Sequence, residues 1–340
     1  MELALSFDDV LLKPRQSSII SRATDVDMSQ MLVNLGQFRL PIISSPMDTV
    51  TETEMAVSMH NAGGLGIIHR YNTIEEQCAM FTEVSELGCL VGAAIGVTGD
   101  FIERATALRR EGIELLCIDV AHAHHVNVRY ALEALRNTFG DGVHIMVGNV
   151  ATLQGFNDVA DWGADSIKVG IGGGSICSTR IQTGHGVPTL QSVLDCAQSD
   201  RDVTLIADGG IRTSGDIVKA LAAGADFVML GSLLAGTEES PGETITNYDG
   251  TVCKVYRGMA SKEAQHLWRG RHSSVEGITH RVPLRGPLDE ILKDLEAGIR
   301  SGLSYSGVTN IPELQIRREF IRQTPAGQIE SSTHIIRNGL

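Results

Sequence analysis

The sequence contains no long hydrophobic run and no targeting signal. Hydrophobic residues make up 42% of the 340 residues, but no apolar stretch approaches the roughly 18 to 20 residues that a membrane-spanning helix requires. The first residues, MELALSFDDVLLKP, lack the basic segment followed by an apolar segment that marks a secretory signal. We therefore expect a soluble globular protein that stays in the cytoplasm and has no membrane partner.

Paired cysteines and a surplus of positive charge are also missing. The six cysteines occur without a CxxC pair, which argues against a zinc knuckle or a disulfide framework and predicts reduced thiols. The 28 basic side chains are outnumbered by 41 acidic ones, which gives a formal net charge of -13. Because such a chain repels a polyanion, we expect no nucleic-acid partner, although backbone amides can still hold a single nucleotide.

Eight short hydrophobic runs are typical of parallel strands buried on both faces, and amphipathic stretches such as FIERATALRREG and SGDIVKALAAGAD alternate with them. The last two runs end in ADGG and LGS, where barrels often hold a phosphate. No GxGxxG turn follows the first run, as it would in a doubly wound open sheet. We therefore predict a (β/α)8 TIM barrel in preference to the open sheet. The runs cover residues 40–46, 63–69, 90–96, 114–121, 143–150, 165–172, 203–210 and 227–232.

Some segments lie outside this alternation. Residues 241–258 predict a hairpin that turns at Asp249 and Gly250, because Asp-Gly supplies the positive φ of a tight turn. Residues 260–285 are polar with little periodicity and predict a short mobile flap. GPLDEILKDLEAGIRSGL then predicts a helix, followed by a C-terminal tail of uncertain structure. No linker divides the chain, so we expect residues 1–340 to form a single barrel catalytic domain.

One cysteine stands in an unusual place. In GGGSICSTR, residues 172–180, Cys177 follows the sixth run directly after three glycines and a serine. Glycines let a backbone approach a ligand or move, and a thiolate is a good nucleophile whose pKa Arg180 is a candidate to lower. A cysteine more often packs as a small hydrophobe, which we expect for Cys117 inside ELLCIDV. For Cys177 the setting predicts a nucleophile.

Glycines and carboxylates follow the later runs. GGGS, ADGG and LGS could present several amides to one phosphate, assisted by the hydroxyls of Ser175 and Ser232, so we predict a nucleotide monophosphate site. Asp119 and Asp208 end the fourth and seventh runs. Each carboxylate either accepts hydrogen bonds from ribose hydroxyls or caps the following helix, and the residues alone leave both readings open.

Three histidines, His122, His124 and His125, follow the fourth run. Their spacing, without a matching carboxylate, is a weak pattern for a metal site. We expect them to face solvent or to stack on a ligand.

Motifs spread over nearly the whole chain carry a resemblance to a known family. They are SFDDVLLKP, SSPMDTVTE, GGLGIIHR, VGNVAT, GIGGGSICSTR, IADGGI, MLGSLLAGT, SPGE and YRGM. Together they resemble the family of IMP dehydrogenase and GMP reductase, with GGG as a departure where the family commonly has a proline or another residue at the second place. The resemblance implies a barrel enzyme, usually a homotetramer. In such an enzyme the loop cysteine forms a covalent thioimidate at C2 of GMP or IMP, and a nicotinamide stacked on the purine exchanges a hydride.

The resemblance also assigns roles to residues. It makes Cys177 the nucleophile, places Asp208 at the nucleotide ribose and places Asp119 at the nicotinamide ribose. The remaining substrate contacts are Ser175, Gly210, Gly231, Ser232 and Tyr256 at the phosphate, Gly258 and Met259 at the base, and Ser45 and Met47 at the floor of the site. Carbonyl groups of Gly172, Gly174 and Cys177 match the family's potassium site, which Glu330 and Ser331 of a neighbouring subunit would complete.

The direction of the reaction depends on the flap. In the family, the dehydrogenase hydrolyses its intermediate with an Arg-Tyr pair on a long flap, whereas KEAQHLWRGRHSSVEGITHRVP contains no such pair and only Arg269 or Arg271 could replace it. The chain also lacks the CBS insertion of most IMP dehydrogenases. Its short flap ends in Glu276-Gly277, as in the reductase, where the glutamate would handle the protons of ammonia. We therefore predict a GMP reductase that converts GMP and NADPH to IMP, ammonia and NADP.

Other features keep alternatives open. YRGM, RGPL, SGLSYSG and QTPAGQIESSTH are closer to IMP dehydrogenase, which would use NAD and water to form XMP. A flavin oxidoreductase and a catalytically silent nucleotide sensor are further alternatives. The choice between NADPH and NAD, the need for potassium and the choice between tetramer and octamer stay open.

Overall fold

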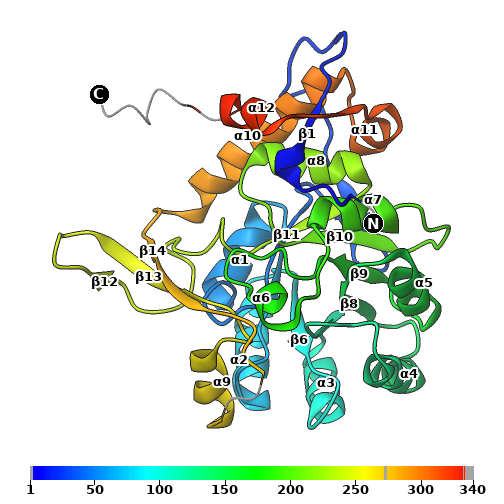
Figure 1. The fold of residues 1–340 in the computed structure, drawn as a ribbon. Helices are drawn as coiled ribbons and strands as arrows, with labels where there is room; N and C mark the ends of the chain where they lie inside the picture. The colour runs from blue at the N-terminus through cyan, green and yellow to red at the C-terminus, as the bar shows by residue number, and fades with distance from the viewer. Residues whose placement is uncertain (1–2, 272–273, 332, 334–340) are drawn as a thin grey trace.

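The centre of the protein is a closed barrel of eight parallel strands (Figure 1). The computed structural model describes residues 3–271, 274–331 and 333. Each predicted hydrophobic run contains one barrel strand, and β11 pairs with β4 to close the cylinder. The TIM barrel prediction is therefore confirmed. The strands are β4 (Ile42–Ser44), β5 (Leu65–Ile68), β6 (Val91–Ile95), β7 (Leu115–Asp119), β8 (His144–Val150), β9 (Ser166–Val169), β10 (Thr204–Asp208) and β11 (Phe227–Leu230).

The barrel interior is filled by apolar side chains. Leu115, Met146, Ile206 and Phe227 meet there with the side chain of Cys117, which is fully buried. Burial raises the pKa of the Cys117 thiol to about 12, which keeps it neutral at physiological pH. The prediction that Cys117 serves packing is confirmed.

Helices surround the barrel, and local signals set their ends. Thr73 caps its helix by accepting a hydrogen bond from the Glu76 N–H at 3.1 Å. Gly112 and Gly224 end the two helices that the sequence predicts, both at positive φ. Between the barrel strands the chain forms α1 (Thr53–Asn61), α2 (Ile74–Glu86), α3 (Phe101–Glu111), α4 (Val126–Phe139), α5 (Leu153–Asp161), α6 (Thr179–Thr183), α7 (Thr189–Cys196) and α8 (Ser214–Ala223), of which the short α6 belongs to the loop that carries Cys177.

A ribbon of antiparallel strands projects from one side of the barrel in Figure 1. It contains β12 (Ile245–Thr246), β13 (Val252–Arg257) and β14 (Thr279–Pro283), with β13 paired to both neighbours. The predicted hairpin is confirmed, because Gly250 has φ of +82° and the Asp249 carboxylate accepts a hydrogen bond from the Thr251 N–H at 3.0 Å.

Residues 260–285, predicted from their low periodicity to be a short mobile flap, contain regular secondary structure. They include α9 (Lys262–Arg269), and their last part is β14, which pairs with β13. Trp268 on α9 stacks on Tyr71, with ring centroids 5.9 Å apart. Tyr71 is almost 200 residues away in sequence, so the polar, aperiodic composition of residues 260–285 could not reveal this contact.

A segment near the start of the chain pairs with one near its end, and β1 is labelled at the top of the molecule in Figure 1. Strand β1 (Val10–Leu12) pairs with β15 (Phe320–Arg322), so the described part of the tail contains a strand that the sequence pattern did not predict. No helix in the described ranges is long and apolar enough to cross a membrane. The remaining elements are η1 (Phe7–Asp9), β2 (Gln30–Leu32), β3 (Gly36–Phe38), α10 (Leu288–Ser306), α11 (Ile311–Arg317) and α12 (Pro325–Glu330), and α10 is the predicted helix.

Candidate active site

A cavity of about 480 Å³ opens at the carboxyl ends of the barrel strands. This is the end where TIM barrels carry their reactive groups. The cavity brings together nearly all site residues that the sequence predicts. They come from the ends of the barrel strands and the loops after β4, β7, β9, β10 and β11, from β13 and from the segment that follows β13. They are Ser45, Met47, Asp119, Gly172, Gly174, Ser175, Cys177, Asp208, Gly210, Gly231, Ser232, Tyr256, Gly258, Met259 and Glu276.

The loop that carries Cys177 requires glycine. The Cys177 N–H donates to the Gly174 carbonyl at 3.1 Å, which closes a tight turn directly before the thiol. Gly172 has φ of +81°, and a Cβ there would lie 2.7 Å from Cγ of Arg180. Because a side chain would meet strain or a clash at this position, the loop can only be built as it is with glycine.

Arg180, the sequence's candidate for a cationic neighbour of Cys177, is held by a backbone carbonyl. Its guanidinium donates to the Val187 carbonyl at 2.9 Å. Its aliphatic stem packs against Gly172 and Gly186. Arg180 therefore supports the cysteine loop from behind.

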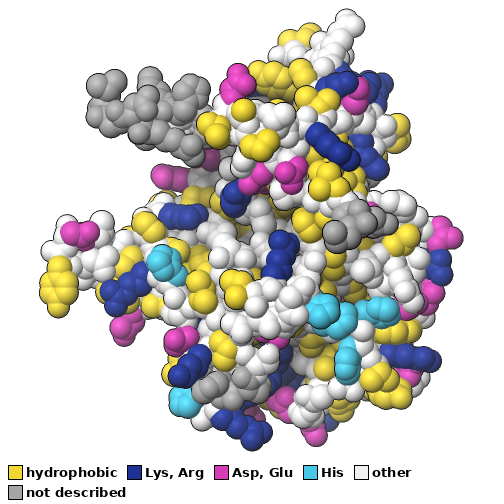
Figure 2. Space-filling view, in the orientation of Figure 1, with side chains coloured by type: hydrophobic (Ala, Val, Ile, Leu, Met, Phe, Trp, Pro, Cys, Tyr) yellow, Lys and Arg dark blue, Asp and Glu magenta, His cyan; other side chains and the backbone are white. Residues whose placement is uncertain are grey.

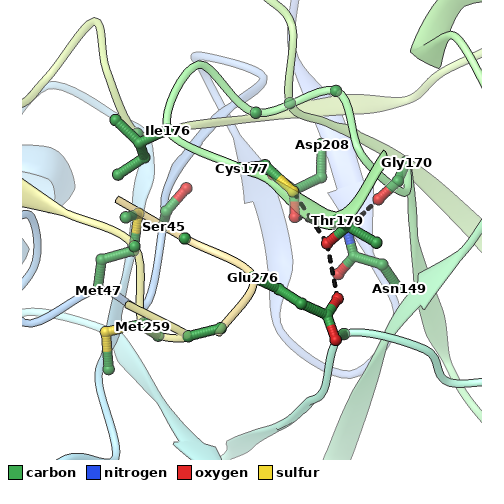
Figure 3. A pocket seen from close by; sticks show the side chains of 18 of the residues that line it. Ser45, Met47, Asn149, Gly170, Ile176, Cys177, Thr179, Asp208, Met259 and Glu276 are labelled. Carbon is green, nitrogen blue, oxygen red and sulfur yellow. Dashed lines mark hydrogen bonds between the residues drawn. The ribbon is translucent and has the colours of Figure 1, made fainter. Parts of the chain in front are cut away.

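Cys177 lies in a chain of hydrogen bonds (Figure 3). Its Sγ donates to Oγ1 of Thr179 at 3.2 Å, and that hydroxyl donates to Oε2 of Glu276 at 2.8 Å. The Ser274 hydroxyl donates to the other carboxylate oxygen at 3.1 Å. Sequence reasoning named Glu276 but missed Thr179, although a hydroxyl two residues after the cysteine in GSICSTR was a usable signal.

The backbone holds this chain in place. The Ser178 N–H donates to the Glu276 carbonyl at 2.9 Å, and the Ile278 N–H donates to the Ile176 carbonyl at 3.0 Å. Cys177 and Gly277 form an antiparallel bridge between these two bonds. The cysteine loop is thus paired with the segment that leads into β14, so the thiol and the carboxylate are positioned together.

Hydroxyl groups and glycines meet at the part of the cavity where the sequence predicts the phosphate. Tyr256 is 5% exposed, and burial raises its pKa to about 12 while a hydrogen bond with Ser175 acts in the opposite direction. A Cβ on Gly231 would lie 3.0 Å from the Tyr256 hydroxyl and 3.3 Å from Sδ of Met47. The absence of a side chain at Gly231 keeps this corner open for a ligand.

A buried ammonium group lies between the two predicted ribose carboxylates. Lys168 on β9 is 1% exposed, and its Nζ forms an ion pair with Asp119 and lies 3.7 Å from Asp208. The amide of Asn149 donates to Asp208 at 2.9 Å and to the Gly170 carbonyl at 2.8 Å (Figure 3). Neither Asp119 nor Asp208 caps a helix, which removes the alternative that the sequence left open.

Burial and the neighbouring charges shift the pKa values of Asp208 and Lys168. Burial raises the pKa of Asp208, while Lys168 and Asn149 act to lower it. Burial alone would lower the pKa of Lys168, but the charges of Asp119 and Asp208 outweigh it and the pKa is raised. Lys168 therefore stays protonated at physiological pH. The sequence did not predict it as a site residue, because it lies inside the hydrophobic strand run DSIKVGIG.

The outer part of the cavity carries positive and aromatic side chains. Arg70 donates to the Asp119 carbonyl at 3.1 Å, and its guanidinium lies 5.5 Å from the ring of Tyr71. Arg269 of α9 also lines this part, whereas Arg271 does not.

The predicted histidines and the predicted tail residues lie outside the cavity. His124 bonds to Asp158 at 2.8 Å, and the ring of His125 accepts a hydrogen bond from the Asn127 N–H. His122 is exposed, and histidine side chains gather on this face of the molecule in Figure 2. Glu330 and Ser331, at the end of α12, do not line the cavity of their own chain.

Comparisons with known proteins agree with this architecture. A family model described as the IMP dehydrogenase / GMP reductase domain matches residues 4–334. The inosine-5'-monophosphate dehydrogenase of Nitrosopumilus maritimus is 34% identical, covering 97% of this chain and 98% of that protein. The GMP reductase of Leishmania major is 33% identical, covering 98% of this chain and 97% of that protein.

A solved structure is also similar. A cysteine-to-alanine variant of GMP reductase from Trypanosoma brucei, in complex with guanosine 5'-monophosphate, superposes with a TM-score of 0.93. Its sequence is 32% identical, and the match covers 98% of each chain. The barrel, the cavity at its carboxyl end and these matches lead to one conclusion: the chain belongs to the IMP dehydrogenase / GMP reductase family of oxidoreductases.

Proposed function

We propose that this protein is a GMP reductase, which converts GMP to IMP and ammonia with a reduced nicotinamide cofactor. The observation that carries the proposal is the hydrogen-bonded chain from Cys177 through Thr179 to Glu276. It joins a nucleophile to a carboxylate inside one cavity, and it provides a path for the proton that a leaving amine must receive.

The nucleotide fits the inner half of the cavity. Gly210, Gly231 and the hydroxyls near Tyr256 receive the phosphate, and Asp208 accepts hydrogen bonds from the ribose hydroxyls. Met47, Gly258 and Met259 then border the purine, with C2 facing the sulfur of Cys177.

In the proposed reaction Cys177 is the nucleophile and Glu276 accepts and returns a proton. The thiol proton of Cys177 moves through Thr179 to Glu276, and the thiolate adds to C2 of guanine. Glu276 returns this proton through the same hydroxyl to the 2-amino group, the C2–N bond breaks, and ammonia leaves a thioimidate between Sγ and C2. When hydride reaches C2, the sulfur leaves with the electron pair of the S–C2 bond and Cys177 regains a proton from solvent.

The outer half of the cavity suits a dinucleotide cofactor, whose nicotinamide would supply the hydride. Asp119 faces this half with its carboxylate held by Lys168, so its oxygens are oriented to accept hydrogen bonds from a ribose. Arg70 and Arg269 add positive charge beside it, which favours the anionic cofactor. We propose NADPH as the cofactor, with NAD as the alternative.

The proposal includes a potassium site that is shared between two subunits of a homotetramer. The carbonyls of Gly172, Gly174 and Cys177 belong to one tight loop at the cavity, and oxygen donors of this kind suit a hard cation. Glu330 and Ser331 would complete the site from a neighbouring subunit of a homotetramer. The six free thiols are compatible with the reducing environment of the cytoplasm, where we propose that the enzyme acts.

IMP dehydrogenase is the second candidate. Relatives with that name are as similar to the chain as those named GMP reductase. The missing insertion does not separate the activities, because the alignment with the Leishmania major reductase also spans 478 positions, against the 340 residues of this chain. In this alternative Arg269, which lines the cavity, would have to activate water without a tyrosine partner beside it in sequence.

The two activities differ in the direction of hydride transfer, so absorbance of the reduced nicotinamide separates them. With GMP and NADPH we expect the absorbance to fall and ammonia to appear in equal amount. With IMP and NAD we expect no change. A rise in the second mixture alone would assign the chain to IMP dehydrogenase, and no change in either mixture would reject both activities.

The role of Glu276 gives a sharper test. Glu276→Gln should reduce kcat for GMP reduction about 10²- to 10⁴-fold, because the amide cannot take and return the proton. The dissociation constant of GMP should change little, since Glu276 lies at the leaving group. Steady-state kinetics and calorimetry measure the two effects.

Glu263→Gln is the matched control for this variant. Glu263 on α9 also accepts a hydrogen bond from a threonine hydroxyl, that of Thr279 at 2.9 Å, but it does not line the cavity. Its replacement should leave kcat unchanged. Equal kcat values for wild type and Glu276→Gln would remove Glu276 from the mechanism.

A further inference from the structure

A buried hydroxyl lies unpaired behind the cysteine loop. Thr189 is the first residue of α7 and is 4% exposed, and its Oγ1 has no hydrogen-bond partner within the described ranges. Buried polar groups are almost always paired, because an unpaired one loses its bonds to water without replacement. The loops beside this hydroxyl are therefore where a partner for it is to be sought in the ligand-bound protein.

The Thr189 hydroxyl faces the glycines of two loops. A Cβ on Gly173 would lie 2.3 Å from Oγ1, and a Cβ on Gly170 or Gly210 would lie 3.4 or 3.5 Å from it. The first two glycines belong to the loop after β9, and Gly210 follows β10. Thr189 thus contacts the junction of the two loops at which the proposed function places the nucleotide phosphate.

An acceptor lies close to this junction. A Cβ on Gly210 would be 3.3 Å from the carbonyl oxygen of Gly173 and 3.5 Å from the Thr189 hydroxyl. Both oxygens therefore lie next to Gly210. Gly173 lies within the cysteine loop, and because glycine is conformationally permissive, its peptide can rotate to bring this carbonyl within reach of the hydroxyl.

We propose that Thr189 is a positioning residue that stabilises the nucleotide-bound arrangement of the two glycine loops. Its hydroxyl donates to the Gly173 carbonyl when the phosphate is bound and loses this partner when the loops relax. The inference rests on the proposed function, because it takes a nucleotide phosphate as the ligand of these loops. A bond that exists only in the bound arrangement strengthens nucleotide binding and does not change the chemical step.

Thr189→Val tests this inference, because valine keeps the shape and removes the hydroxyl. We expect the dissociation constant of GMP, measured by calorimetry in a Cys177→Ala background that forms no covalent adduct, to rise about 3- to 10-fold, as loss of one hydrogen bond predicts. The value of kcat at saturating GMP should stay unchanged. The melting temperature without ligand should not fall, because the lost hydroxyl has no partner in that state.

Two further variants separate this role from a structural one. Thr189→Ser keeps the hydroxyl and should bind GMP within about twofold of wild type. Ser192→Ala removes another buried hydroxyl of α7 without a partner in the described ranges, at a residue that does not border these glycines, and should leave the dissociation constant unchanged. If Thr189→Val folds poorly, Thr189→Ala provides the same loss of the hydroxyl.

The outcomes distinguish this inference from the proposed function. Wild-type binding of GMP together with unchanged binding by the valine or alanine variant would overturn the role of Thr189 alone. Equal weakening by serine and valine would also overturn it, because the hydroxyl would then be irrelevant. If the wild-type protein bound neither GMP nor IMP, the proposed function would fail, and the role of Thr189 would fail with it.

Discussion

Replacing Cys177 with alanine should lower turnover at least about 10³-fold, while GMP binds nearly as well as to the wild-type protein. The thiol is the only group in the Cys177, Thr179 and Glu276 chain that can form a bond to C2, so its removal ends the covalent route. The phosphate and ribose contacts come from other loops and remain. Cofactor oxidation in the presence of GMP measures the first effect, and calorimetry measures the second.

A covalent adduct provides an independent readout. Wild-type protein incubated with GMP alone should gain the mass of the purine nucleotide without its 2-amino group, and Cys177→Ala should not. Cys89→Ala is the control, because Cys89 is another thiol that lies outside the cavity. Undiminished turnover by Cys177→Ala would reject covalent catalysis for this protein.

Lys168→Met should destabilise the fold by about 3 kcal/mol at pH 7, the cost of leaving buried carboxylates without their cation. Asp119 and Asp208 would then face each other across the floor of the cavity without the ammonium between them. Breaking a buried ion pair usually costs about 3 to 5 kcal/mol. We expect the lower value because the side chains of Asp119 and Asp208 are 23% and 20% exposed at the cavity. Chemical denaturation gives the free energy of unfolding.

The loss should depend on pH in a defined direction. Without Lys168, the already raised pKa of Asp208 rises further, so the folded state binds a proton more tightly than the unfolded chain does. The stability gap from wild type therefore widens as the pH rises toward neutral and narrows as it falls toward the unfolded-state pKa of about 3.9. Denaturation at several pH values measures this trend.

Lys254→Met is the control for the pH effect. Lys254 is also nearly buried, but it donates to the carbonyls of Glu238 and Ser240 and makes no ion pair within the described residues. Its loss should cost stability without the recovery at low pH. A Lys168→Met protein as stable as wild type at pH 7 would show that the two carboxylates do not depend on the ammonium.

The barrel could be predicted because each strand is buried on both faces and therefore appears as a continuous hydrophobic run. Cys177 could be recognised because three glycines before a thiol are a poor pattern for core packing. Both patterns involve residues that are close in sequence, so they can be recognised without knowing which distant segments are in contact.

Lys168 and the order within residues 260–285 could not be predicted in the same way. Nothing in the residues next to Lys168 indicates that it will lie between Asp119 and Asp208, because these two carboxylates come from other strands. The stacking of Trp268 on Tyr71 likewise joins segments almost 200 residues apart, and composition reports nothing about such contacts. Thr179 is different, since its hydroxyl stood two residues from the cysteine and only its link to Glu276 required the fold.

The antiparallel ribbon has a consequence for substrate choice under the proposed function. Strand β13 supplies Tyr256 at one end of the nucleotide, and the segment before β14 carries Glu276 beside the reacting carbon at the other. Because β13 and β14 are paired residue by residue and Glu276 lies three residues before β14, the ribbon restrains the spacing between Tyr256 and Glu276. We therefore expect the ribbon to favour purine nucleotides that are long enough to contact both Tyr256 and Glu276, and to disfavour shorter purine compounds such as free bases.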